Sequence, residues 1–142
     1  MEWVQDKMNN NFKLLVVTIL GPQSSGKSTL LNYLVGSKFS VSAGRCTKGL
    51  NAMILKTDFE ETKEILILDS EGIFSIERND PMYDRRLSIF CLAVSNMLLI
   101  NIKGELNIEI EKVLQVAIYA LQKIAQVAAI QRKARIQFIL RD

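Results

Sequence analysis

The sequence has no histidine and only two cysteines, Cys46 and Cys91, which lie far apart along the chain. Zinc sites of the usual Cys/His kind and hydrolysis by a Ser-His-Asp triad are therefore excluded within these 142 residues. Cys91 stands in an apolar run and is expected in the core, whereas Cys46 is expected in a polar loop. The chemistry of this chain must rest on other side chains.

Long, clean apolar runs are also missing. The longest candidate, residues 113–130, carries three glutamines and a lysine, which predicts a helix packed on a sheet rather than a helix in lipid. Residues 1–11 are polar and charged without the pattern of a signal peptide, so we interpret them as a leader or linker and expect a cytosolic protein.

Strong charge of one sign is absent as well. The net charge is +3, and the basic residues are scattered apart from the cluster at 132–135. That cluster is expected to follow the C-terminal end of a helix, where cations suit the helix dipole, so nucleic-acid binding is not predicted. The apolar share of 49% is that of an ordinary globular protein, and the length suits one domain over residues 1–142.

Residues 21–28, Gly-Pro-Gln-Ser-Ser-Gly-Lys-Ser, fit the pattern G-x-x-x-x-G-K-[ST] of a phosphate-binding loop. The run before it, residues 14–20, is almost wholly aliphatic, which predicts a parallel strand buried on both faces. The residues after it, 28–35, have apolar positions at helical spacing and stop at Gly36, which predicts a helix.

This placement explains how the motif binds phosphate. Gly21 and Gly26 permit a tight turn that points backbone N–H groups at an anion, and the helix that follows adds its positive end. Lys27 is a flexible cation that reaches the outer phosphates, and the hydroxyl of Ser28 is the expected Mg²⁺ ligand.

Strands alternate with helices along the whole chain. The predicted strands are 14–20, 50–57, 64–68, 97–102 and 136–140, and the predicted helices are 28–35, about 84–95 and about 108–132. The acidic connection at 58–61 predicts a hairpin, so one strand of that pair is expected to run antiparallel at an edge. The result is an α/β fold in three layers, with a mostly parallel sheet.

Ligand groups in such a fold gather at the carboxyl ends of the strands. Asp69 follows the aliphatic run 65–68 and can hold Mg²⁺, and Gly72 offers a backbone N–H to the terminal phosphate. Thr47, between two glycines in the polar loop 37–49, is expected to reach Mg²⁺ when that phosphate is present.

Two further polar residues near these strand ends are interpreted as structural. Asn101, at the end of a predicted buried strand, could approach the site, but an ordinary polar strand end is the commoner reason for an asparagine there. Glu71 is expected to pair with a backbone N–H group or a lysine.

The sequence resembles the GTP-binding domain of the very large interferon-inducible GTPases in four segments, residues 21–32, 41–49, 68–72 and 141–142. These GTPases belong to a wider set that includes guanylate-binding proteins, atlastins and dynamins. The resemblance implies a G-domain-like phosphate-loop NTPase that binds GTP or GDP with Mg²⁺. It implies Ser28, Thr47 and Asp69 at the metal. The implied nucleotide-binding residues are Gly21, Ser25, Gly26, Lys27, Ser28, Thr29, Asp69, Gly72, Arg141 and Asp142. Arg141 and Asp142 would read guanine, because a carboxylate accepts both N1–H and N2–H.

The chain departs from its relatives at two positions. Ser24 stands where guanylate-binding proteins place an arginine, and Gln23-Ser24 resembles the dynamin arrangement that holds the attacking water. Ile73 replaces the water-orienting glutamine of small GTPases. Arg45 is the candidate for stabilising charge in cis, a role worth roughly 10³ to 10⁵ in rate. The residues assigned to hydrolysis are Lys27, Gln23, Ser24, Thr47 and Arg45.

Three functional classes stay open: a Mg²⁺-dependent GTPase, a nucleotide-dependent switch or assembly module with little hydrolysis, and an ATP-using relative. The expected partners are a guanine nucleotide and a second copy of the G domain, with slow hydrolysis until assembly. No nucleic acid and no transmembrane segment are expected, and membrane association is left open. Because the sequence stops at Asp142, we expect the domain to be incomplete at its C-terminus.

Overall fold

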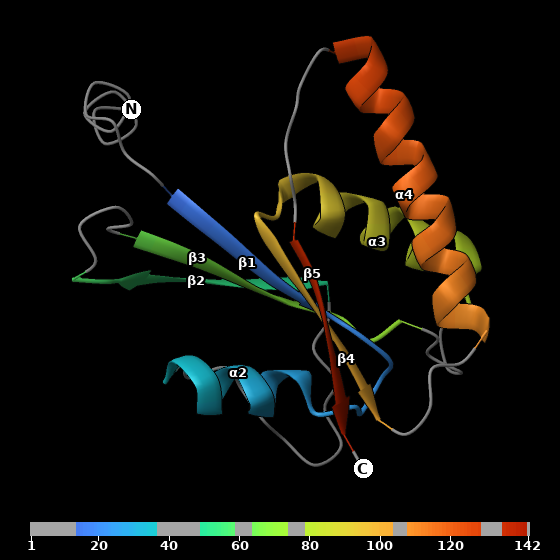
Figure 1. The fold of residues 1–142 in the computed structure, drawn as a ribbon. Helices are drawn as coiled ribbons and strands as arrows, with labels where there is room; N and C mark the ends of the chain where they lie inside the picture. Colours follow the sequence, from blue (N-terminus) through green and yellow to red (C-terminus); the bar gives the residue numbers. More distant parts are fainter. Residues whose placement is uncertain are drawn as a thin grey trace.

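The computed structural model describes residues 14–36, 49–58, 64–73, 79–103, 108–128 and 135–141 (Figure 1). Strands alternate with helices through these residues, except that β2 is followed directly by β3. In chain order they are β1 (Leu14–Leu20), α2 (Lys27–Val35), β2 (Leu50–Lys56), β3 (Glu64–Ser70), α3 (Pro81–Val94), β4 (Met97–Lys103), α4 (Ile108–Ala128) and β5 (Arg135–Arg141).

The strands form one sheet in the order β2-β3-β1-β4-β5. β1 lies in the centre and runs parallel to both β3 and β4, and β5 runs parallel to β4. β2 is antiparallel to β3 at one edge. Helix α2 covers one face of the sheet, and α3 and α4 cover the other (Figure 1). The predicted α/β fold, mostly parallel with one antiparallel edge strand, is confirmed.

The fully buried residues of the sheet lie in β1, β3 and β4, and the core is divided between the two faces of the sheet. Leu98 and Leu99 are neighbours in β4 but pack in different clusters, because side chains alternate between the faces of a strand. The cluster toward α2 consists of Ile19, Leu31, Ile67 and Leu99. The cluster toward α3 and α4 consists of Leu20, Ile73, Leu87, Cys91, Leu92, Leu98, Ile100, Ile102, Ile110, Leu114 and Ala117.

Cys91 is fully buried in the larger cluster, as predicted. Burial disfavours the charged thiolate and raises the pKa of this thiol from its usual 9.0 to about 12. The side chain therefore acts as a small apolar group. Cys46 lies outside the described residues.

Two element boundaries differ from the prediction. α3 begins at Pro81 rather than near residue 84, because the Asp80 carboxylate accepts hydrogen bonds from the backbone N–H groups of Met82 and Tyr83, at 3.1 and 3.0 Å. β3 continues to Ser70 rather than stopping at residue 68, because its pairing with β2 extends to Leu50 opposite Ser70.

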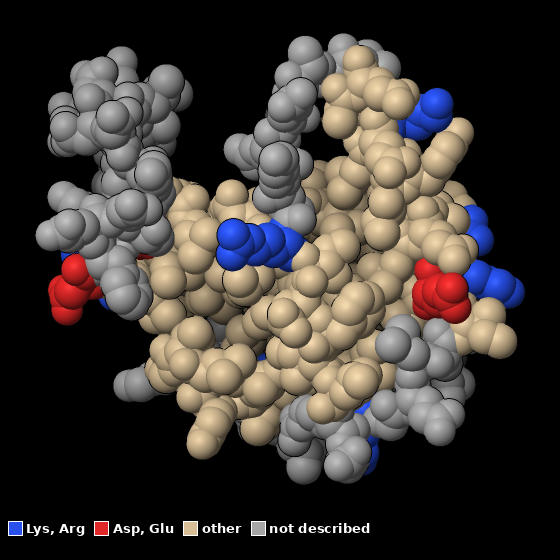
Figure 2. Space-filling view, in the orientation of Figure 1, with Lys and Arg blue, Asp and Glu red and all other residues tan. Residues whose placement is uncertain are grey.

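The other predicted elements are confirmed within a residue or two over the described part of the chain. Gly36 ends α2 with a left-handed φ of 61°, as the sequence indicated. The last predicted residues of the long helix, 129–132, and the predicted leader, 1–11, lie outside the described residues, so those assignments stay predictions. No helix among the described residues has the length and apolarity needed to cross a membrane. On the face drawn in Figure 2, the described basic side chains are scattered, and one at the right lies beside an acidic group.

Candidate functional site

The loop between β1 and α2 has the backbone shape of an anion cradle. Ser24 and Gly26 both take positive φ angles, 59° and 80°, and the backbone N–H of Ser25 donates to the carbonyl of Pro22 at 3.3 Å. Gly26 is the N-cap of α2 and provides no side-chain cap to the helix. The positive end of α2 is thus left open to an anion that binds at the loop.

Lys27 lies folded over this loop. Its side chain is 7% exposed, and Nζ donates to the carbonyl oxygens of Gly21 at 3.2 Å and Pro22 at 3.0 Å. These bonds satisfy a cation that would otherwise be costly to bury. They also hold the positive charge beside the mouth of the loop.

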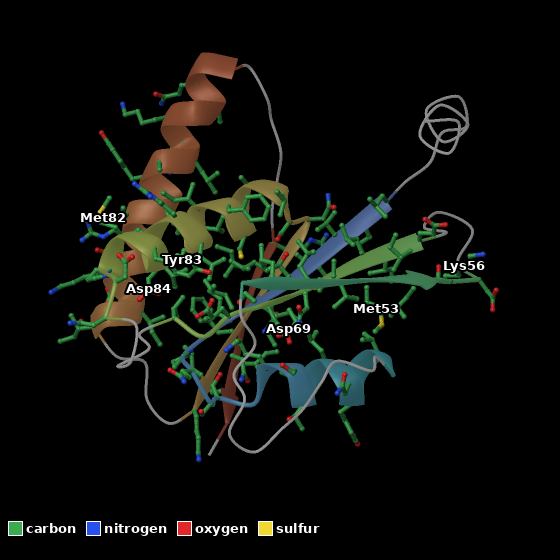
Figure 3. All side chains as sticks on the ribbon, turned by 180° about the vertical axis from the view of Figure 1, so that it is seen from behind. Met53, Lys56, Asp69, Met82, Tyr83 and Asp84 are labelled. Atoms are coloured by element: carbon green, nitrogen blue, oxygen red, sulfur yellow. The ribbon has the colours of Figure 1, made fainter. Side chains whose placement is uncertain are left out.

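Ser28 and Asp69 form the next part of the site. The Ser28 hydroxyl donates to Oδ2 of Asp69 at 2.5 Å, which joins the first turn of α2 to the carboxyl end of β3. Asp69 is fully buried and lies on the face of the sheet that carries α2 (Figure 3). A hydroxyl and a carboxylate this close together are hard oxygen ligands of the kind Mg²⁺ prefers, so this pair fits the predicted metal.

No group of three or more cysteine, aspartate or glutamate side chains with the spacing of a metal site occurs among the described residues. A cation at Ser28 and Asp69 would need additional ligands. Mg²⁺ commonly takes them from substrate phosphates and water rather than from a full protein cage. The donor set therefore suits a metal that binds together with a nucleotide.

Gly72 and Ile73 lie directly against the loop. The backbone N–H of Gln23 donates to the carbonyl of Ile73 at 3.2 Å, and the N–H of Ile73 donates to the carbonyl of Gly21 at 3.1 Å. A Cβ atom at Gly72 would lie 2.3 Å from Cα of Gln23, so only glycine fits there. The segment after β3 is thus fixed to the phosphate-binding loop by backbone contacts.

Ile73 is 1% exposed and belongs to the larger core cluster. Its side chain packs against apolar neighbours, which agrees with the expectation that it takes no part in orienting water. Within the same stretch of loop, Ser24 and Thr29 are exposed, and Gln23 is partly buried.

Asn101 requires a correction. Its fully buried side chain donates from Nδ2 to the backbone carbonyl of Ser25 at 2.7 Å and to Oγ of Ser25 at 3.1 Å. The interpretation as an ordinary polar strand end is wrong, because the side chain is bonded to the phosphate-binding loop. An asparagine that follows four consecutive aliphatic residues in a predicted strand was the available signal.

Glu71 connects three segments of the chain. One of its carboxylate oxygens, Oε2, accepts hydrogen bonds from the backbone N–H of Gly49 at 2.7 Å and from the hydroxyl of Tyr83 at 3.0 Å. The backbone partner was predicted. Tyr83 was not, because the predicted helix began after it, whereas α3 includes it in its first turn (Figure 3).

Several predicted site residues cannot be compared with the structure. Thr47, Arg45 and Asp142 lie outside the described residues, and Arg141 is described only as the last backbone position of β5. The metal-binding threonine, the arginine in cis and the guanine-reading pair therefore stay predictions.

These features together define an α/β domain of the phosphate-loop class. They are a central parallel strand, a glycine-bounded loop over a helix N-terminus, a buried lysine and a carboxylate at the end of the neighbouring strand. The family model described as the URGCP-like GTPase domain matches residues 1–142, and the chain belongs to this family.

The curated relatives agree with this assignment. The chain is 42% identical over 122 residues to interferon-induced very large GTPase 1 of Mus musculus, and 40% identical over 131 residues to that of Homo sapiens. These matches cover 81% and 87% of this chain but only 5% of each relative. A Protein SEY1 homolog of Dictyostelium discoideum is 42% identical over 103 residues, which is 68% of this chain and 12% of that protein. The predicted resemblance to very large interferon-inducible GTPases is confirmed.

Proposed function

We propose that this chain binds GTP together with Mg²⁺ and hydrolyses the terminal phosphoanhydride bond, as the GTP-binding domain of a large GTPase. Family membership supports GTP as the nucleotide. The single observation that supports the metal most directly is the 2.5 Å contact between the Ser28 hydroxyl and the Asp69 carboxylate. This contact lies at the N-terminal end of α2, where a nucleotide's phosphates bind in this class of fold.

The phosphates would bind at the loop and at Lys27. Backbone N–H groups at the start of α2 stabilise negative charge, and Lys27 has only to rotate from the carbonyls of Gly21 and Pro22 toward the outer phosphates. Bound Mg²⁺ would bridge phosphate oxygens and offset the charge that develops during transfer. Ser28 and Asp69 are the described residues that would hold it, and Thr47 is the proposed third protein ligand.

Hydrolysis needs a positioned water, and the buried side chain of Ile73 does not supply the group that positions it. We assign that role to Gln23 and Ser24, assisted by the backbone N–H of Gly72. Arg45 is the proposed source of positive charge in cis. Arg141 and Asp142 are the proposed guanine-reading pair, and assembly with a second copy of the domain is the proposed way of accelerating a slow reaction.

A second function is favoured by one observation. Because Ile73 is in the core, the usual water-orienting position of small GTPases is lost. A nucleotide-dependent switch or assembly module that hydrolyses GTP slowly or not at all is therefore the alternative. An ATP-using relative remains the second alternative, and nucleotide competition separates it from the other two.

The test is a titration of fluorescent GTP, GDP and ATP against the chain, in Mg²⁺ and in EDTA. We expect guanine-selective, Mg²⁺-dependent binding that weakens about 100-fold or more in Lys27→Ala, because a direct charge contact to phosphate is lost. Asp69→Asn should weaken binding in Mg²⁺ and have little effect in EDTA. Lys112→Ala, an exposed lysine in α4, is the matched control and should bind as the wild type does.

Phosphate release at several protein concentrations separates the two leading functions. Turnover that rises with protein concentration supports a GTPase activated by self-association. Tight GTP binding without turnover at any concentration favours the switch. Equal affinity of wild type and Lys27→Ala would contradict phosphate binding at this loop.

A further inference from the structure

We propose that Asn101 is a positioning residue for phosphate binding, which sets the direction of a backbone N–H group in the loop. The inference rests on the proposed function, because it assigns a role within the same phosphate site. It starts from an unusual placement. β4 lies between β1 and β5, and its residues Leu98, Leu99 and Ile100 are buried aliphatics, yet the next position is a fully buried amide.

This placement has a cost that packing does not explain. A buried amide loses its contacts with water and must recover them from protein partners. Nδ2 of Asn101 does so through Ser25, but Oδ1 has no hydrogen-bond partner among the described residues. A leucine has the same branched skeleton of heavy atoms and needs no hydrogen-bond partner at either tip. The half-satisfied amide therefore indicates a role beyond filling space.

The orientation of the amide follows from its partner. The carbonyl oxygen of Ser25 can only accept a hydrogen bond, and it lies 2.7 Å from Nδ2 of Asn101. Rotating the amide by half a turn would place two oxygens against each other, with no proton between them. The donor side of Asn101 is thus fixed toward Ser25.

The same bond orients the next peptide unit. In a trans peptide, the C=O of one residue and the N–H of the next point in opposite directions. Because the carbonyl of Ser25 points toward Asn101 in the sheet, the N–H of Gly26 points away from the sheet, toward the concave side of the loop. Gly26 has a left-handed φ of 80° and is the N-cap of α2, so its N–H belongs to the set that faces a bound phosphate.

Asn101 also contacts the first residue of the loop. A Cβ atom at Gly21 would lie 2.1 Å from the backbone oxygen of Asn101, so the two backbones are in close contact. Asn101 thus touches the loop at Gly21 through its backbone and at Ser25 through its side chain. One residue of β4 fixes both ends of the turn that surrounds the phosphates.

The test compares Asn101→Leu and Asn101→Ser with the wild type. Leucine keeps the branched shape of the side chain and removes the donor, whereas serine is smaller and keeps a hydroxyl that can donate to Ser25 through a water. We expect GTP to bind roughly tenfold more weakly to Asn101→Leu, which is the loss of one buried hydrogen bond, and Asn101→Ser to recover part of the affinity. The affinity of pyrophosphate, measured by competition, should fall by the same factor, because the substitution acts on phosphate binding and not on base recognition.

A spectroscopic readout separates positioning from a merely structural role. In ¹⁵N–¹H spectra of the wild type, the Gly26 amide proton and the Asn101 side-chain amide should both shift when pyrophosphate is added. In Asn101→Leu, the Gly26 resonance should shift before any ligand is added and respond less to pyrophosphate. Ser88→Ala is the matched control. Ser88 is equally buried, but its hydroxyl donates to the Asp84 carbonyl within α3, so its loss should lower stability and leave affinity unchanged.

The outcomes are distinct. If wild type binds GTP and Asn101→Leu binds equally well with an unchanged Gly26 resonance, the inference is overturned and the proposed function stands. If wild type binds neither GTP nor pyrophosphate, the proposed function fails and the inference fails with it. If Asn101→Leu does not fold, wild-type spectra in which pyrophosphate shifts neither amide overturn the inference, and shifts of both support it.

Discussion

In strands β3 and β4, aliphatic positions and the polar positions that lie nearer the carboxyl ends are buried to the same degree, yet their chemistry differs. In β3, Ile67 is 1% exposed and Asp69 is 0% exposed. In β4, Leu98 and Asn101 are both 0% exposed. The aliphatic positions stabilise the fold by burial alone, and many similar residues would serve. The polar positions lose water on burial, so each is tied to a particular partner in the phosphate-binding loop.

This contrast separates the residues of the proposed site from the residues of the core. Burial does not distinguish Asp69 and Asn101 from the core, because these side chains are as fully buried as the aliphatic residues of the same strands. The distinction is in the hydrogen bonds, from Ser28 to Asp69 and from Asn101 to Ser25. Substitutions at the buried aliphatic positions should therefore alter the free energy of unfolding. Substitutions at Asp69 and Asn101 should alter nucleotide affinity as well.

The largest loss of stability is expected from Ile100→Ala. Ile100 is 1% exposed in the larger core cluster, and removing its side chain leaves a cavity that costs about 2–5 kcal/mol of unfolding free energy. Urea denaturation measures this loss. The fraction that stays folded should bind nucleotide normally, and a large fall in its affinity would break the proposed separation of core from site.

Gly72→Ala should lower both the free energy of unfolding and the nucleotide affinity. The new methyl group would lie 2.3 Å from Cα of Gln23 and would push the segment after β3 away from the loop, at a cost of about 1–3 kcal/mol. Nucleotide affinity should fall with it, as measured by titration. Gly36→Ala is the control: unlike Gly72, Gly36 has a left-handed φ of 61° and no atom within 4 Å of its Cβ position, so alanine there should lower stability through backbone strain and leave nucleotide affinity unchanged. Normal nucleotide binding by Gly72→Ala would argue against a tight contact here.

A moderate effect of pH on the free energy of unfolding is expected through the thiol of Cys91. Its pKa is raised to about 12 in the folded state by burial, from a usual 9.0. Its stabilising contribution is complete below pH 9 and is lost as pH rises toward 12, because the unfolded chain releases the proton first. The free energy of unfolding should fall by about 1 kcal/mol per pH unit above 9 through this group. Cys91→Ala should show a shallower pH dependence, and identical slopes would contradict the prediction.

The smallest effect is expected from Tyr83→Phe. This change removes only the hydroxyl that donates to Glu71 at 3.0 Å, for a loss of about 0.5–1.5 kcal/mol. Thermal denaturation measures it, and Tyr33→Phe, which changes a tyrosine 88% exposed on α2, should have no effect. Because Glu71 also bonds Gly49, hydrogen exchange at the Gly49 amide should quicken in Tyr83→Phe. Unchanged exchange would show that the two bonds to Glu71 are independent.

Much of the fold was predictable from local pattern. The aliphatic run of β1, the glycines on either side of α2 and the acidic hairpin connection each have a direct physical meaning in sequence. The start of α3 lies three residues before the predicted one, because Asp80 and Pro81 together are a helix-start signal that apolar periodicity alone does not reveal. The extent of β3 was missed because pairing with β2 decides it, and the strand itself does not.

For the candidate site, the sequence alone determined which residues are proposed to bind phosphate and metal, since the motif specifies Lys27 and Ser28 and the strand end specifies Asp69. Tertiary structure alone decided their partners. Residues 25 and 101 are distant in sequence, and so are residues 71 and 83, so no local spacing predicts the bonds between Asn101 and Ser25 or between Glu71 and Tyr83. Those bonds depend on strand order and helix placement, which bring separate strand ends and a helix start to one edge of the sheet.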